Sequence, residues 1–348
     1  MALNAVAGFR RLWTAASVAL LAAAGCGDPR RPVVPRRQLV DCASEAEARP
    51  TIESLLSSIR LDEGAPCGTT PSVPLPSERE HAVDALVHGL RYATVPVRLA
   101  CARAIRRIGP LAEAEAVAIA TAITNHVAGL HPVRCEILSV LACRGRSGDT
   151  RTASVVRSYL ESHDPEIGRL AASVLLTLRD DTVLSNAIER GAAHTQLSAL
   201  AGLLYDPSEH AARFRASVVR AASAHDASVR LEAVKLLSSW PDSDGPSLDA
   251  LAERLAEDQS TPVRVFAAGG LGARARDVPV RIEPTLALLL GVLDDSSPEL
   301  RAQAAASIGT LRGRTGEILA RLRRAASDDP DDRVRREASR ALRLAEGR

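Results

Sequence analysis

An arginine recurs along this chain at a spacing of about 34 to 37 residues, each time within a short stretch of helical pattern. One longer step, of 61 residues, divides into 27 and 34 if Gln196 fills the missing position. A proline lies within five residues before six of the seven arginines, and small residues follow them at fixed offsets. A fixed period of this size predicts stacked repeats, because one repeat cannot bury its apolar face alone. The arginines are Arg98, Arg134, Arg169, Arg230, Arg264, Arg301 and Arg335.

The stretch Asp294–Arg314 shows what one copy predicts. Ser297 suits a helix N-cap, and Pro298 suits the first helical position. An apolar stripe at helical spacing follows. Other copies have an apolar partner segment upstream, as at 248–256, 284–293 and 318–326. We therefore predict an all-α fold, an α-solenoid of stacked antiparallel helix pairs, with about eight pairs and sixteen helices over residues 80–348 and no sheet.

The composition constrains the core of such an array. Aromatic residues make up only 2% of the chain, so the core must consist of Ala, Leu, Val and Ile. Small residues let helices approach closely, which predicts tight helix–helix packing. The run Gly269-Gly270-Leu271-Gly272 falls within a predicted helix, so we interpret it as a packing position and not as a phosphate-binding loop.

The N-terminus has the layout of an export signal over residues 1–25. Two arginines precede an apolar run that is too short to span a bilayer core of about 30 Å. The following Ala23-Ala24-Gly25-Cys26 resembles a bacterial lipobox, although that family usually has Leu where Ala23 stands. The resemblance implies cleavage after Gly25 and lipidation of Cys26, with palmitate among the acyl chains. An ordinary secretory signal with an incidental cysteine is the alternative.

Three further segments follow the signal. We expect residues 26–50 to form a Pro- and Arg-rich tether that begins with the lipidated cysteine. We expect residues 51–79 to form an N-terminal cap and residues 80–348 to form the solenoid. Export places cysteines where disulfides persist, and we expect Cys42 and Cys67 to staple the cap. Cys135 and Cys143 lie too far apart on one straight helix to form a disulfide.

No C-x-x-C or H-E-x-x-H motif occurs in the sequence, so we predict no metal site and no cofactor.

The repeated segments resemble the HEAT-repeat family, especially its short PBS-lyase HEAT-like form with the pattern D…VRxxAAxAL. The resemblance covers Glu80 to Leu344 and is strongest in 258–271, 294–311 and 328–342. It implies that turn aspartates and helix arginines form a structural ladder between repeats. Aspartates stand six residues before three of the arginines, at Asp258, Asp295 and Asp329. The earlier repeats depart from this, with Tyr92, Ala128, His163 and Ala224 at that position.

The ladder arginines admit a second interpretation, in which an exposed row of guanidinium groups binds phosphates. The charge balance disfavours a nucleic-acid partner. Removing residues 1–25 takes Arg10 and Arg11 from the 44 basic residues and leaves 42 against 42 acidic ones, so no basic footprint exists. The acidic run at 328–332 precedes a helix start and lacks EF-hand spacing, so we assign it to capping.

The predicted function is that of a non-catalytic scaffold. A lipid-anchored solenoid, facing the periplasm or the cell exterior, would bind another protein or peptide on its concave face as a monomer. That face would carry the outward positions Arg103, Arg106, Glu232, Lys235, Gln303, Arg336 and Arg340. The alternative is an enzyme or enzyme-assembly factor of the PBS-lyase type. Export conflicts with that alternative, because such a lyase needs a cytoplasmic pigment-protein substrate.

Overall fold

The computed structural model describes residues 79–108, 111–124, 131–144, 148–204, 213–240, 245–311 and 315–345, all within one compact unit, Glu45–Arg348. The predicted lipidation site Cys26 and the predicted pair Cys42 and Cys67 lie outside these residues, together with the signal and the tether. Those assignments stay predictions.

The described residues form sixteen α-helices and contain no strand. The first helices of successive pairs are α3 (Arg79–Tyr92), α5 (Glu113–Thr124), α7 (Thr150–Leu160), α9 (Asp181–Arg190), α11 (Arg215–Ala221), α13 (Gly245–Glu257), α15 (Pro279–Val292) and α17 (Gly316–Asp328). The second helices are α4 (Val95–Ile108), α6 (His131–Arg144), α8 (Pro165–Leu178), α10 (Ala193–Leu204), α12 (Ala227–Ser239), α14 (Thr261–Arg274), α16 (Pro298–Thr310) and α18 (Asp332–Ala345). A 3-10 turn, η3 (Ala275–Asp277), follows α14.

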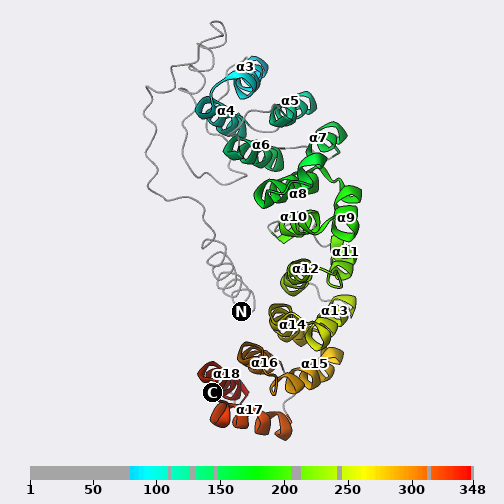
Figure 1. Ribbon diagram of the computed structural model, residues 1–348, viewed down its shortest axis with the longest axis vertical. Coiled ribbons are helices and arrows are strands. Elements are labelled where there is room, and N and C mark those ends of the chain that lie inside the picture. Colours follow the sequence, from blue (N-terminus) through cyan, green and yellow to red (C-terminus); the bar gives the residue numbers. More distant parts are fainter. Residues whose placement is uncertain are drawn as a thin grey trace. The chain divides into compact units, whose positions relative to one another are not determined.

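The helices stack in two layers (Figure 1). Each even-numbered helix packs against its odd-numbered partner and against the even-numbered helices before and after it. We call the row from α4 to α18 the even layer. The stacking of neighbouring helix pairs without any strand confirms the predicted all-α solenoid for the described part of the chain. None of the described helices combines the length and the apolar character needed to cross a membrane.

Helix starts follow the capping chemistry that the sequence predicts. The α16 helix begins at Pro298, and the Ser297 hydroxyl accepts a hydrogen bond from the Leu300 amide at 3.4 Å. The helix α15 begins at Pro279, five residues before the apolar segment at 284–293. Pro284, the sixth residue of α15, has no backbone N–H, so one helical hydrogen bond to the carbonyl of Val280 is missing. Val280 is exposed, so water can bond to that carbonyl instead. The helix therefore tolerates Pro284.

Small residues set the spacing of the even layer. A Cβ atom on Gly270 would lie 2.1 Å from the Ser238 hydroxyl of the preceding repeat. A Cβ atom on Gly272 would lie 2.5 Å from the Cβ of Ser307 on the following one. These distances are far below ordinary van der Waals contact. Because glycine has no Cβ, α14 can lie this close to α12 and α16. The glycine run is a packing position, as its place within a predicted helix indicates.

Candidate functional site

The arginines of the periodic pattern lie on the even layer, one on each helix except α10, where Gln196 stands in the equivalent position. In the second half of the array Arg230, Arg264 and Arg301 bond to the aspartate of the next repeat, whereas Arg335 on the last helix donates to the Asp329 carbonyl before its own helix. The Arg230 guanidinium contacts Asp258 through Nε and Nη2 at 2.7 and 2.9 Å. The Arg264 Nη2 lies 2.7 Å from Asp295, and these pairs connect successive repeats.

Arg301 shows the full set of contacts that such an arginine makes. Its Nε and Nη2 donate to the two Asp329 oxygens, both at 2.8 Å. Its Nη1 donates to the backbone carbonyl of Asp295, at 2.8 Å, in the turn before its own helix. A planar fork can satisfy a carboxylate and a turn carbonyl at once. These guanidinium groups are therefore occupied within the array and do not form a row of free phosphate ligands.

The ladder shifts the titration of its carboxylates. The hydrogen bonds from Arg301 hold the pKa of Asp329 below its usual value. Burial would raise the pKa of Asp258, but the hydrogen bonds from Arg230 and from the Ser260 amide outweigh it and lower that pKa. Both carboxylates stay ionised at neutral pH.

The first half of the array uses other contacts. Arg98 is buried, and its Nε donates to the Ala93 carbonyl at 2.6 Å. Gln196 donates from Nε2 to the Ile188 carbonyl of α9 at 2.8 Å. Arg134 and Arg169 lie half-buried on α6 and α8. The turn before α8 carries Asp164, whose Oδ2 lies 2.8 Å from His131 Nε2 on α6.

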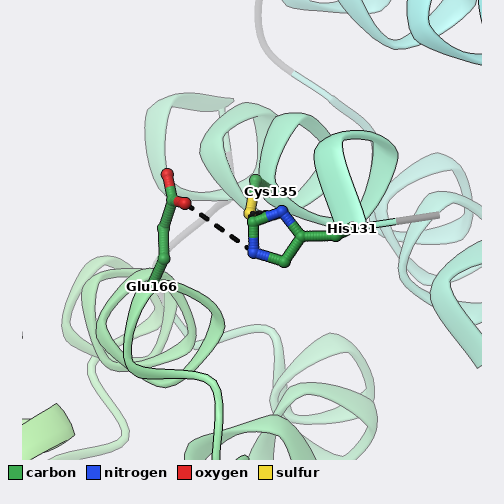
Figure 2. Close-up of side chains that lie close together, drawn as sticks. All are labelled: His131, Cys135 and Glu166. Atoms are coloured by element: carbon green, nitrogen blue, oxygen red, sulfur yellow. Dashed lines mark hydrogen bonds and ion pairs between the residues drawn. The ribbon is translucent and has the colours of Figure 1, made fainter. Parts of the chain in front are cut away.

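His131 belongs to a cluster with Cys135 and Glu166 (Figure 2). His131 and Cys135 lie one turn apart on α6, and Glu166 lies in the first turn of α8. The His131 Nε2 is 3.7 Å from both the Cys135 Sγ and the Glu166 Oε2. One imidazole nitrogen, one sulfur and one carboxylate oxygen thus converge within 4.8 Å of one another. Burial raises the pKa of the Cys135 thiol to about 12, and the nearby carboxylates of Glu166 and Asp164 add to this effect.

The sequence does not show this cluster as a local motif, because its three ligands are not all close together along the chain. His131 and Cys135 do stand at i and i+4, which places them on one helix face. Glu166 lies one repeat later, so only the stacking of α6 on α8 brings the third donor to them. The signal in the sequence is an acidic residue about one repeat period after a His and Cys pair at i and i+4.

The outward positions of the even layer bear mostly charged side chains. Arg103 and Arg106 of α4 lie 4.0 and 3.4 Å from the Glu136 carboxylate on α6. The Lys235 ammonium of α12 lies 2.6 Å from Glu232 and 5.4 Å above the ring centroid of Phe266. Arg336 and Arg340 of α18 are exposed, and Gln303 of α16 is half-buried. The residue types at these outward positions are mostly charged and differ from repeat to repeat, whereas the periodic arginine recurs on nearly every even helix.

The two-layer stacking and the cross-repeat contacts define the class of protein, an α-solenoid of helical repeats. Residues 248–343 match the family model for HEAT repeats. This segment runs from within α13 to within α18, across the last three helix pairs, and it includes the Arg301–Asp329 pair. The predicted resemblance to HEAT repeats is thus confirmed over that segment, while the lipoprotein signal stays a prediction.

Similar chains exist among solved structures. An engineered protein is 17% identical, with a TM-score of 0.45 and coverage of 88% of this chain and 87% of the other. YibA of Escherichia coli is 12% identical, with a TM-score of 0.45 and coverage of 87% and 98%. Importin beta is 12% identical, with a TM-score of 0.47 and coverage of 85% and 48%. All three TM-scores are below 0.5, so the fold assignment depends on the helix pairs of this chain itself. No curated protein matches the sequence.

Proposed function

We propose that this protein is a non-catalytic scaffold that binds another protein or peptide along the outward surface of its even layer. The observation that carries the proposal is the separation of two sets of residues. Periodic arginines such as Arg264 and Arg301 are engaged within the array, Arg301 by Asp329 and by the Asp295 carbonyl. The positions that differ between repeats, such as Arg103 and Arg340, lie outside those bonds, at side-chain exposures of 43% and 69%.

The chemistry of this surface suits a protein or peptide ligand. It carries arginines at both ends of the even layer, and acidic, amide and aromatic side chains between them. Arginine and aromatic side chains are enriched at the centres of protein interfaces. A helical-repeat array supplies an extended surface on which several such contacts can act together.

We further propose that the chain is a bacterial lipoprotein anchored through Cys26. The support is the sequence pattern at residues 1–26, a short apolar run that ends in Ala-Gly-Cys. Two or more acyl chains hold a protein on a membrane stably, whereas one chain binds reversibly. An anchored array would display its binding surface in the periplasm or at the cell exterior.

Two experiments test these proposals separately. In the first, a tagged full-length chain is crosslinked in its native membranes and then purified. A defined partner should be recovered with the wild type. The double variant Arg336→Glu and Arg340→Glu should recover less of that partner. Recovery of no partner by a folded wild type contradicts the scaffold proposal.

Metabolic labelling with an alkyne fatty acid tests the lipid anchor, because the wild type should be labelled and Cys26→Ala should not. Equal labelling of both would exclude lipidation at Cys26.

A further inference from the structure

The His131, Cys135 and Glu166 cluster is a different kind of site from the ladder, because its three side chains offer three different metal-binding atoms. Imidazole nitrogen, thiolate sulfur and carboxylate oxygen are the protein ligands of zinc. Calcium and magnesium prefer oxygen donors alone. The composition of the cluster therefore selects a transition metal ion of borderline softness.

The three donor groups lie close enough together to share an ion once the Cys135 side chain rotates. Zinc lies about 2.0–2.1 Å from nitrogen, 2.3 Å from sulfur and 2.0–2.2 Å from oxygen, so two donors of one tetrahedron stand about 3.3–3.6 Å apart. The His131 Nε2 lies 3.7 Å from the Cys135 Sγ and 3.7 Å from the Glu166 Oε2. Both separations come within a few tenths of an ångström of the tetrahedral value. The Cys135 Sγ also lies 3.9 Å from the His131 Nδ1, so the sulfur stands beside the ring, and the Cys135 side chain must rotate to reach an ion on Nε2. Figure 2 shows the Cys135 sulfur beside the His131 ring and the Glu166 carboxylate close to one nitrogen of that ring.

We propose that His131, Cys135 and Glu166 form a binding site for one divalent transition metal ion, with Zn²⁺ the ion that best fits the donor set. Three protein ligands leave a fourth tetrahedral position for water or an external donor. Asp164 is the competing group at this site, because its Oδ2 lies 2.8 Å from the same His131 nitrogen. The ion would displace that contact. The other Asp164 oxygen, Oδ1, already accepts hydrogen bonds from the Glu166 and Ile167 amides at 3.0 and 3.2 Å.

The position of the site suggests what the ion does. Farther along the array, successive even helices are joined by Arg–Asp pairs such as Arg301–Asp329. Between α6 and α8 the turn aspartate, Asp164, instead pairs with His131. An ion held by two side chains of α6 and one of α8 would join these two repeats. The site does not depend on the proposed scaffold function.

The test uses the full-length chain purified in detergent and stripped of metal by a chelator, after mass spectrometry has shown that the Cys135 thiol is reduced. The metal probes are Zn²⁺, measured by competition with a chromogenic chelator, and Co²⁺, whose spectrum reports thiolate ligation. We expect about one ion per chain, a cobalt–thiolate absorption band and protection of Cys135 from alkylation by Zn²⁺.

Matched variants locate the ion. His131→Gln, Cys135→Ser and Glu166→Gln should each weaken Zn²⁺ binding by at least about tenfold, and Cys135→Ser should abolish the cobalt–thiolate band. His225→Gln, in the turn of a distant repeat, should bind like the wild type. Circular dichroism and the unfolding midpoint of metal-free protein verify that each variant is folded. Absence of binding by reduced wild type, or equal binding by the folded ligand variants, would overturn the proposal.

Discussion

Arg301 of α16 donates two hydrogen bonds to Asp329, the residue that follows the next helix, α17, and it also donates one to the Asp295 carbonyl of its own turn. The side chains of both Arg301 and Asp329 are about nine-tenths buried, at 11% and 8% exposure. One guanidinium thus connects a helix, the turn before it and the next repeat. The stability of a repeat array depends on such nearest-neighbour contacts.

Removal of this joint should destabilise the array strongly. Arg301→Ala leaves the Asp329 carboxylate buried without its partner, which costs about 3 kcal/mol or more. Urea denaturation of the purified protein measures the change. Arg281→Ala is the matched control, because Arg281 pairs with Asp249 at an exposed position, where an ion pair contributes about 1 kcal/mol or less. Equal losses in the two variants would show that the buried fork adds nothing beyond a surface ion pair.

The ladder should also determine acid stability. Because Arg301 lowers the folded-state pKa of Asp329, the pair stabilises the fold above the unfolded-state pKa of about 3.9, and that stability is lost as the pH falls through the folded-state pKa. Melting midpoints between about pH 6 and pH 3 should therefore fall less for Asp329→Asn than for the wild type. Asp249→Asn, at the exposed pair, should follow the wild type. Parallel curves for Asp329→Asn and the wild type would contradict this assignment.

Glycine at the helix contacts should be required for close packing. An alanine at position 272 places its Cβ 2.5 Å from the Ser307 Cβ and 2.8 Å from the Ser307 Cα, so α14 and α16 must separate. We expect Gly272→Ala to cost about 1–3 kcal/mol despite the better helix propensity of alanine. Gly291→Ala meets no atom within 4 Å and should stabilise the protein by up to about 1 kcal/mol. Thermal unfolding of the two variants compares them, and stabilisation by both would refute the packing argument.

Much of the fold could be predicted because each repeat contains local sequence signals for where its helices begin and which face they bury. The Ser297 cap and Pro298 set the start of α16, and the apolar stripe sets the face that it buries. The start of α15 is less evident from the sequence, because its apolar segment begins at Pro284, five residues after the helix begins. An exposed helix tolerates the loss of one hydrogen bond there, and no pattern in the sequence reports that tolerance.

The contacts between repeats were harder to predict than the repeats. The resemblance implies that turn aspartates pair with arginines across repeats, but it does not say which neighbouring repeat supplies the arginine. The carboxylate of Asp295 pairs with Arg264 of the preceding repeat. The pairing follows from the stagger of neighbouring helices, which one sequence does not show. The His131, Cys135 and Glu166 cluster was missed for the same reason, since its members meet only when α6 stacks on α8.

The central claim, that the outward surface of the even layer binds a partner, is tested most directly by site-specific photo-crosslinking in native membranes. A photoreactive amino acid replaces Arg103 on α4 or Arg340 on α18, each five residues after its ladder arginine, and replaces the exposed Asn186 on α9 as the control. We predict that positions 103 and 340 yield adducts with the same protein or complex and that position 186 yields none. Absence of adducts at both even-layer positions, or an equal yield at position 186, would contradict the account.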